Sequence, residues 1–234
     1  MRQEPRALAL IDVVLVVGVA IAVQSVLTPF TSRFASLGTA LSVLALASIL
    51  INHRGWSWRD FGLQGPGSLK QGIITVGQAM LALVCLVIIG ALTSKGLSMF
   101  LDHPVVTDDR FAGIEGNIPS YIMWLVIGWV VGGFTEEMVF RGFLINRVEA
   151  FLKNEAPIVK TTALSLVAII IPAVLFGFAH YWNRGLYGAL QIIPIGIGFG
   201  LFYLLYGRRL LPLILAHGTV DTLGITSRFL NADW

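Results

Sequence analysis

Five ionisable side chains stand inside apolar segments of the chain, where their types predict chemistry on water. Glu136 and Glu137 are adjacent carboxylates in a segment that begins wholly apolar. His180 ends a second apolar segment, and a third contains His217 and Asp221. An ionisable group inside a membrane costs roughly 2.5–3.5 kcal/mol on insertion scales, so it is retained where it pairs or serves a function. Five such groups on three apolar segments therefore indicate a functional site.

The spacing of these residues predicts how they pair. Glu137 precedes Arg141 by four residues, the favourable order for an ion pair along one helix. Glu136 projects in another direction and lacks this partner, so it is the carboxylate free to exchange a proton. His217 and Asp221 are also four apart, so they share a helix face and the carboxylate can orient the imidazole.

Two carboxylates with two imidazoles, and with no Ser or Cys beside a base, predict activation of water rather than a covalent intermediate. Each group also has a simpler interpretation when it is taken alone. The Glu136 segment could be a helix reaching the membrane interface, His180 could be interfacial, and His217 with Asp221 could be a structural pair. The joint pattern favours a catalytic site.

Composition places these residues in a membrane protein. Of 234 residues, 56% are hydrophobic and only 12% are charged, and the mean hydropathy is +0.81. Soluble domains have roughly 25% charged residues, so most of this surface must face lipid. Only helices or a closed barrel span a bilayer, and the long apolar runs predict helices. The expected fold is an all-α, polytopic transmembrane helical bundle of about seven spans.

Segments of about 20 apolar residues locate the spans. The first is too long for a typical signal-peptide core and no clear cleavage site follows it, so we expect an uncleaved helix. We expect residues 1–110 to hold variable N-terminal helices and residues 111–234 to hold the catalytic core. The seven expected spans are about Ala7–Thr28, Phe34–Ile51, Gln71–Leu92, Ser120–Phe143, Thr162–His180, Gly185–Tyr206 and Leu210–Ile225.

The basic residues flank the spans, so the net charge of +3 reflects topology rather than binding of nucleic acid. Ten Lys and Arg residues fall on one side of the seven spans, and Arg141 lies within a span. This asymmetry predicts an integral membrane protein with a cytosolic N-terminus and an outer C-terminus, in the plasma (inner) membrane if the source is bacterial. The five basic residues on the other side are Arg33, Lys95, Arg110, Arg184 and Arg228.

Three motifs occur in order: Glu136-Glu137-x-x-x-Arg141, Phe176-x-x-x-His180 and His217-x-x-x-Asp221. Together they resemble the CAAX-processing and bacteriocin-processing (CPBP, or Abi) family of intramembrane proteases, which includes the type II CAAX prenyl endopeptidases. The resemblance covers about Trp124–Asp221. The first 110 residues resemble the family only as generic apolar helices.

The resemblance implies an endopeptidase that cleaves a peptide bond near the membrane, with a role for each residue. Glu136 would be the general base and would hold the attacking water with His180. His217 and Asp221 would stabilise the oxyanion, while Glu137, Arg141 and Phe176 would support the site. The family often has Asn at the last position, and an ionised Asp221 would repel an oxyanion. Either Asp221 is protonated, or it is ionised and orients His217. We favour the second alternative.

The substrate is expected to be a peptide or protein, as in CAAX-type or leader-peptide processing, and it can be prenylated. Membrane lipid is the other expected partner. Zinc is a possible cofactor on Glu136, His180 and His217, but His-Glu-x-x-His spacing is missing, and we favour a metal-free site. The alternative function is a non-catalytic membrane scaffold or bacteriocin-immunity factor with the same fold.

One expectation conflicts with a shared site. If its helix enters from the cytosol at Thr162, His180 lies about 27 Å deep at 1.5 Å per residue, whereas Glu136 should lie nearer the cytosol. The two residues meet only if this helix starts later, tilts strongly or is interrupted at Pro172.

Overall fold

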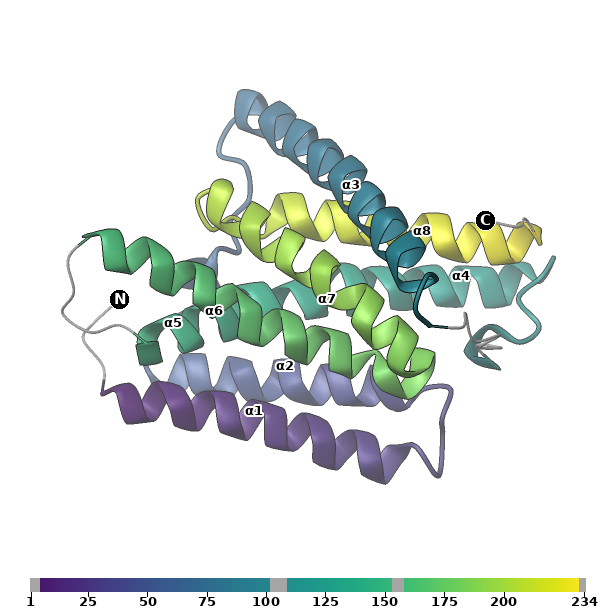
Figure 1. Cartoon of the computed structure of the whole chain (residues 1–234), viewed down its shortest axis with the longest axis horizontal. Coiled ribbons are helices and arrows are strands. Elements are labelled where there is room, and N and C mark those ends of the chain that lie inside the picture. Colours follow the sequence, from purple (N-terminus) through teal and green to yellow (C-terminus); the bar gives the residue numbers. More distant parts are fainter. Residues whose placement is uncertain (1–4, 102–108, 153–157, 232–234) are drawn as a thin grey trace.

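A computed structural model describes residues 5–101, 109–152 and 158–231 of the chain. These residues form seven helices, with a kink in α7 at Gly185, and two short 3₁₀ turns, so the predicted all-α membrane bundle is confirmed (Figure 1). The fourth continuous helix runs from Ile118 to Leu152 and consists of three consecutive pieces. The elements are α1 (Arg6–Leu27), α2 (Ala35–His53), η1 (Trp58–Phe61), α3 (Leu69–Leu97), η2 (Asp109–Phe111), α4 (Ile118–Ile127), η3 (Gly128–Ile145), α5 (Asn146–Leu152), α6 (Ile158–Ala179), α7 (Tyr181–Leu205) and α8 (Leu211–Leu230).

Within the described residues, five helices are long and apolar enough to cross a membrane: α1, α2, α3, Ile118–Leu152 and α7. The apolar part of α6, Ala163–Ala179, is shorter. The remaining helix, α8, is continuous, but its apolar sequence is interrupted by polar residues between His217 and Thr222. Both helices that fall outside the five therefore contribute to the predicted site.

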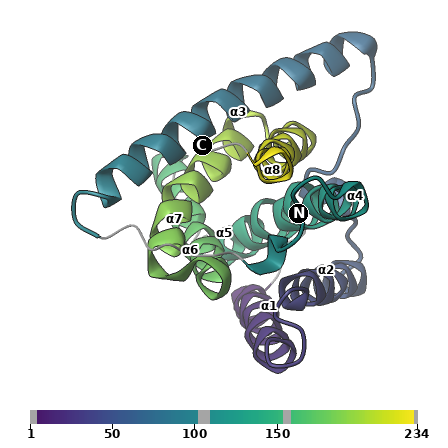
Figure 2. The same ribbon diagram turned by 90° about the vertical axis from the view of Figure 1, so that its right-hand side faces the viewer.

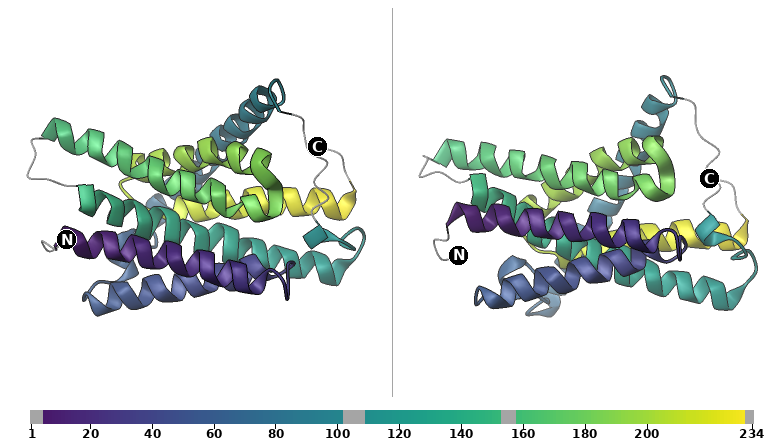
Figure 3. Two further views of the ribbon diagram at one scale, coloured as in Figure 1. Left: turned by 60° about the horizontal axis from the view of Figure 1, so that its bottom comes forward. Right: turned by 90° about the horizontal axis from the view of Figure 1, so that it is seen from below.

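The central element of the bundle is η3, which packs against α2, α6 and α8. Helix α3 crosses the outer side of α7 and α8 obliquely (Figure 2). Helices α1 and α2 lie side by side (Figure 3). Helix α2 packs against η3, and α1 packs against α5. This arrangement places the segment with Glu136 and Glu137 among helices from both halves of the chain.

The segment η3 is a π-helix of 18 residues, Gly128–Ile145. Its wider turn is visible in a side chain as well, because the Thr135 hydroxyl donates to the Val130 carbonyl five residues earlier, at 2.7 Å. Extended π-helices are rare, and single π turns often occur at functional sites. Here the π-helix contains Glu136, Glu137 and Arg141.

The expected end of the fourth span at Phe143 is wrong, because the helix continues for nine residues to Leu152. The polar residues of this extension are buried in contacts with other helices, so the helix has no need to end at the interface. Because the helix continues to Leu152, Glu136 lies farther from this end of the bundle than the sequence predicted. Glu136 therefore lines the same cavity as the corner between α6 and α7. No interruption at Pro172 is needed, since α6 is helical through this proline.

Small residues allow η3 and α8 to approach closely. A Cβ atom on Gly133 would lie 3.1 Å from the Gly218 Cα, and one on Gly128 would lie 3.2 Å from the Asp221 Cβ. Gly128 and Gly132 are four residues apart, a spacing of small residues that is typical of packed membrane helices.

At one end of the bundle, buried carboxylates pair with arginines from distant helices. The two oxygens of Asp12 contact Arg54 Nη2 at 2.5 Å and Arg147 Nε at 3.0 Å. Glu149 accepts from Arg208 Nη2 at 2.7 Å and from the Ser165 hydroxyl. We call this the paired end, and define it by these residues: Asp12, Arg54, Arg147, Glu149, Ser165 and Arg208.

Candidate active site

The carboxylate of Glu137 joins η3 to α8. Its Oε1 accepts a hydrogen bond from Arg141 Nη1 at 2.9 Å and another from His217 Nδ1 at 2.8 Å. The Glu137 side chain is fully buried and Arg141 is 2% exposed. The Arg141 guanidinium also lies over the rings of Phe176 and Phe199, at 4.4 and 4.5 Å from their centroids. The predicted helical ion pair is therefore present, and it is fixed by aromatic packing.

His217 lies between the two adjacent carboxylates. Since Glu137 accepts from Nδ1, the other nitrogen of the ring, Nε2, faces Glu136 and is 3.7 Å from its Oε2. The ring is further packed by Phe199, with centroids 5.0 Å apart. The spacing within α8 predicted that Asp221 orients His217. In the described residues, His217 Nδ1 instead donates a hydrogen bond to Glu137. The contact depends on the close approach of η3 and α8, which spacing within α8 does not reveal.

Asp221 lies one turn beyond His217 on α8, against the glycines of η3. A Cβ on Gly132 would overlap its carboxylate and would lie 3.6 Å from His217 Nε2. Gly132 thus makes room for Asp221 beside the imidazole.

His180 occupies the corner between α6 and α7, where it is the N-cap residue of α7. Its Nδ1 lies 2.8 Å from the Phe176 carbonyl oxygen. Because a carbonyl only accepts, the proton is on Nδ1, and Nε2 is left to bind other groups. The Phe176 ring packs edge-on against His180 at 4.8 Å. Phe176 therefore positions His180 through its backbone and Arg141 through its ring.

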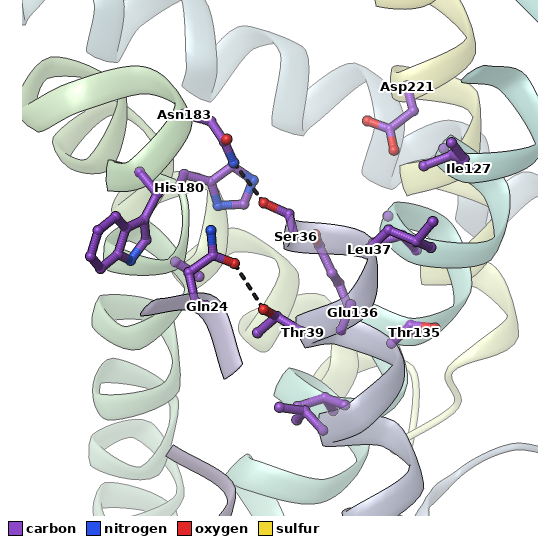
Figure 4. Close-up of a pocket in the computed structure, with 18 of the residues that line it drawn as sticks. Gln24, Ser36, Leu37, Thr39, Ile127, Thr135, Glu136, His180, Asn183 and Asp221 are labelled. Carbon is purple, nitrogen blue, oxygen red and sulfur yellow. Dashed lines mark hydrogen bonds between the residues drawn. The ribbon is translucent and has the colours of Figure 1, made fainter. Parts of the chain in front are cut away.

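A cavity of about 690 Å³ brings the predicted residues together (Figure 4). Glu136, His180, His217 and Asp221 all line it, whereas Glu137 lies behind His217 and is fully buried. Glu136 is 21% exposed and His217 is 10% exposed, so both are reached from the cavity. The structure thus places four of the five predicted catalytic residues on one cavity and the fifth in direct contact with one of them.

Polar side chains of α1 and α2 line the same cavity and were not predicted as site residues. The Thr39 hydroxyl donates to Gln24 Oε1 at 2.8 Å, and Asn183 Nδ2 donates to the Ser36 hydroxyl at 2.9 Å (Figure 4). The second bond joins α2 to the α6–α7 corner beside His180. These residues lie outside the three motifs, so their only signal in the sequence is a polar side chain in or next to an apolar span.

The described residues contain no group of three or more His, Cys, Asp or Glu side chains arranged to hold a metal ion. His217 Nδ1 is already bonded to Glu137, and His180 Nδ1 to a carbonyl. Each imidazole therefore keeps its Nε2 for a further contact.

A polytopic helical bundle with carboxylates and imidazoles around an internal cavity defines a membrane protein equipped for acid–base chemistry. Residues 118–223 match the family model described as type II CAAX prenyl endopeptidase Rce1-like. Residues 118–223 therefore form an Rce1-like domain of the CPBP/Abi family, as the three motifs predicted, and this match points to an intramembrane protease. Comparisons with curated proteins and with solved structures find no match.

Proposed function

We propose that this protein is an intramembrane endopeptidase that hydrolyses a peptide bond with a water molecule activated by Glu136. The observation that carries the proposal is the position of Glu136. Its Oε2 lies 3.7 Å from His217 Nε2, on a cavity that His180 also lines. A partly exposed carboxylate beside an oriented imidazole is the arrangement that general acid–base catalysis requires. The family match at residues 118–223 supports the same reaction class.

In the proposed reaction Glu136 accepts a proton from water while the water oxygen bonds to the substrate carbonyl carbon. The resulting tetrahedral intermediate carries its negative charge on the former carbonyl oxygen. Glu136 then gives the proton to the amide nitrogen, the C–N bond breaks, and a carboxylic acid and an amine leave. One side chain thus acts first as a base and then as an acid.

His180 and His217 are the groups that hold the water and the oxyanion. The Phe176 carbonyl binds only Nδ1 of His180. Nε2 can therefore accept a hydrogen bond from the attacking water beside Glu136. His217 is held through Nδ1 by the Glu137 carboxylate, and its Nε2 faces the cavity, where the doubly protonated imidazolium can donate to the oxyanion. Asp221 lies next to this nitrogen across Gly132 and adds a second acidic group beside the imidazole.

Peptide cleavage by purified protein tests the proposal. Wild type and Glu136→Gln are reconstituted in liposomes and given a mixed peptide library that includes farnesylated CAAX peptides, with and without a chelator. Glu115→Gln makes the same chemical change at an exposed position away from the cavity and is the matched control. We expect cleavage by wild type and Glu115→Gln, and cleavage slower by about 10²- to 10⁴-fold by Glu136→Gln.

Equal cleavage by Glu136→Gln would refute the assignment of the base and would point to a contaminating protease. A library left intact by all three proteins would favour the non-catalytic scaffold or immunity factor. Cleavage that stops with chelator and returns with zinc would show that the protease depends on a metal ion and would contradict the metal-free mechanism.

A further inference from the structure

The arginines that line the cavity are the starting point, because the predicted topology places them on the side that has fewer basic residues. Basic residues are depleted from the outer loops of membrane proteins. In the topology predicted for this chain five basic residues nevertheless lie on the outer side. One of them, Lys95, is exposed near the end of α3. The other four line the cavity within the described residues: Arg33, Arg110, Arg184 and Arg228.

These four arginines come from four separate elements, so they are gathered by the fold and not by local sequence. Arg33 lies in the turn between α1 and α2, and Arg110 lies in η2. Arg184 is in the first turns of α7, and Arg228 is in the last turn of α8. We call this group the arginine mouth; it lies at the end of the bundle opposite the paired end.

Arg33 is held in place and retains unused hydrogen-bonding capacity. Its guanidinium lies over the rings of Trp124 and Phe34, at 5.6 and 5.7 Å from their centroids. Trp124 is only 5% exposed, so this support is rigid. Arg33 Nε is buried and has no hydrogen-bond partner among the described residues. A buried donor without an acceptor is costly, and a bound acceptor group would remove that cost.

Arg228 is also held by its surroundings. Its Nη1 donates to the Gly224 carbonyl at 2.9 Å, and its guanidinium lies over the Phe111 ring at 4.7 Å. Arg110 and Arg184 line the same cavity as His180 and Asp221, so their charges lie on the same hollow as the candidate catalytic groups. The mouth is therefore electrostatically connected to the candidate active site.

Arginines outnumber carboxylates among the described residues that line the cavity. Among the described lining residues, the four arginines face two carboxylates, Glu136 and Asp221. An arginine guanidinium binds carboxylates through two parallel hydrogen bonds, which makes arginine the preferred residue for such groups. The cavity also presents amides and hydroxyls, from Gln24, Ser36 and Asn183, that suit a peptide backbone better than an acyl chain.

We propose that the arginine mouth is a substrate subsite that binds carboxylate groups of a peptide close to its scissile bond, so that the protein selects acidic peptide segments. This inference rests on the proposed function for its meaning in catalysis. The binding site itself is independent of turnover, and the test below separates the two.

Peptide binding to the Glu136→Gln protein tests the subsite without cleavage. The probes are a fluorescein-labelled, C-terminally amidated decapeptide with three glutamates and its counterpart with three glutamines, measured by fluorescence anisotropy in phosphatidylcholine nanodiscs. We expect the acidic probe to bind about tenfold more tightly, as one or two charge-assisted hydrogen bonds provide. Adding Arg33→Gln or Arg228→Gln should remove most of this preference, and high salt should weaken it.

Two control variants separate the subsite from general charge and from folding. Lys95→Gln removes a positive charge on the same side but outside the cavity, and it should keep the full preference. Arg33→Lys keeps the charge but loses the planar guanidinium, so its preference should fall between that of the parent protein and that of the Arg33→Gln variant. In wild type, a cleaved acidic peptide should show a lower KM than its amide counterpart with a similar kcat.

Equal affinity for both probes, or a preference that survives Arg33→Gln combined with Arg228→Gln, would overturn the proposal. It would also fall if these variants lost co-purified anionic lipid while peptide preference stayed unchanged, because the mouth would then be a lipid site. Preferential binding without cleavage of any peptide would refute the protease and leave the subsite standing. Cleavage of peptides without any preference for the acidic probe would refute the subsite and support the protease.

Discussion

The two ends of the bundle use arginine in opposite ways. At the paired end, Arg54 and Arg147 contact the carboxylate of Asp12, and Arg147 is fully buried. At the arginine mouth, Arg33 and Arg228 are supported by aromatic rings and line a cavity of about 690 Å³. The charge count of a segment therefore says little about its task. At the paired end each arginine contacts a carboxylate of the protein itself, whereas Arg33 Nε is buried without a hydrogen-bond partner among the described residues.

Each end therefore has a distinct expected response to mutation. Changes at the cavity should reduce cleavage and leave folding intact, because these side chains face open space. Changes at the paired end should reduce stability first, because breaking a buried pair leaves a charge without compensation.

The largest effect is expected for Glu136→Gln, which removes the proposed base while keeping its shape. Positioned general acid–base groups contribute about 10²- to 10⁴-fold, and the cleavage rate should fall by that factor. The thermal midpoint in detergent should match that of wild type, since Glu136 is partly exposed and its Oε2 is 3.7 Å from His217 Nε2. A large fall in the midpoint would show that Glu136 belongs with the structural pairs and would break the comparison.

The next effect is expected for Asp12→Asn at the paired end. The change removes the charge that both Arg54 and Arg147 contact, and breaking a buried pair costs about 3–5 kcal/mol. The free energy of unfolding should fall accordingly in a denaturant titration, while kcat per folded molecule stays near that of wild type. Glu115→Gln, exposed and remote, is the control. A selective loss of kcat would place Asp12 in the catalytic machinery instead.

A smaller effect is expected for Gly132→Ala, which pushes the Asp221 carboxylate away from His217. The added methyl meets the end of a flexible side chain, so the fold should tolerate it. The cleavage rate should fall about ten- to hundredfold, as small misplacements of catalytic groups do. Gly77→Ala in α3, where a Cβ meets nothing within 4 Å, is the matched control and should keep full activity. Equal rates for the two variants would show that the position of Asp221 is unimportant.

The smallest effect is expected from pH at the turn η1, near the paired end. Hydrogen bonds from the Ser57 backbone amide and hydroxyl to Asp60 lower the pKa of this carboxyl below its ordinary value of 3.8. A lowered folded-state pKa gives a stabilisation that is present above the unfolded value and is lost as pH falls through the lowered one. Asp60→Asn should therefore slightly lower the thermal midpoint near neutral pH, and the difference from wild type should vanish in strong acid. A difference that is constant with pH would contradict this assignment.

The sequence predicted the helices and the pairing of Glu137 with Arg141 because both depend on local information. Apolar runs define spans, and a spacing of four residues defines a pair on one helix. The partner of His217 could not be predicted in this way. The contact of Nδ1 with Glu137 joins residues 80 positions apart, and it requires both the π-helical turn of η3 and the glycines that admit α8.

The end of the fourth span was mispredicted for a related reason. Glu149 and Arg147 read as loop residues when their partners are unknown, since charged groups are normally placed in water. Only the folded bundle brings Asp12, Ser165 and Arg208 to them. The arginine mouth had a signal in the sequence, the basic residues on the predicted outer side, but nothing local marks them as neighbours.

The position of the cavity in one half of the bundle has an electrical consequence. A hollow that takes up water and ions conducts, so a voltage across the membrane would fall mainly over the other half, where the paired end lies. Moving one elementary charge through the full potential is worth about 2.3 kcal/mol per 100 mV. Asp12, Arg147 and Glu149 would therefore stand in the steep part of the field, and protons could reach Glu136 from the cavity almost without electrical work. The paired end would then be the part of the bundle across which most of the membrane voltage drops.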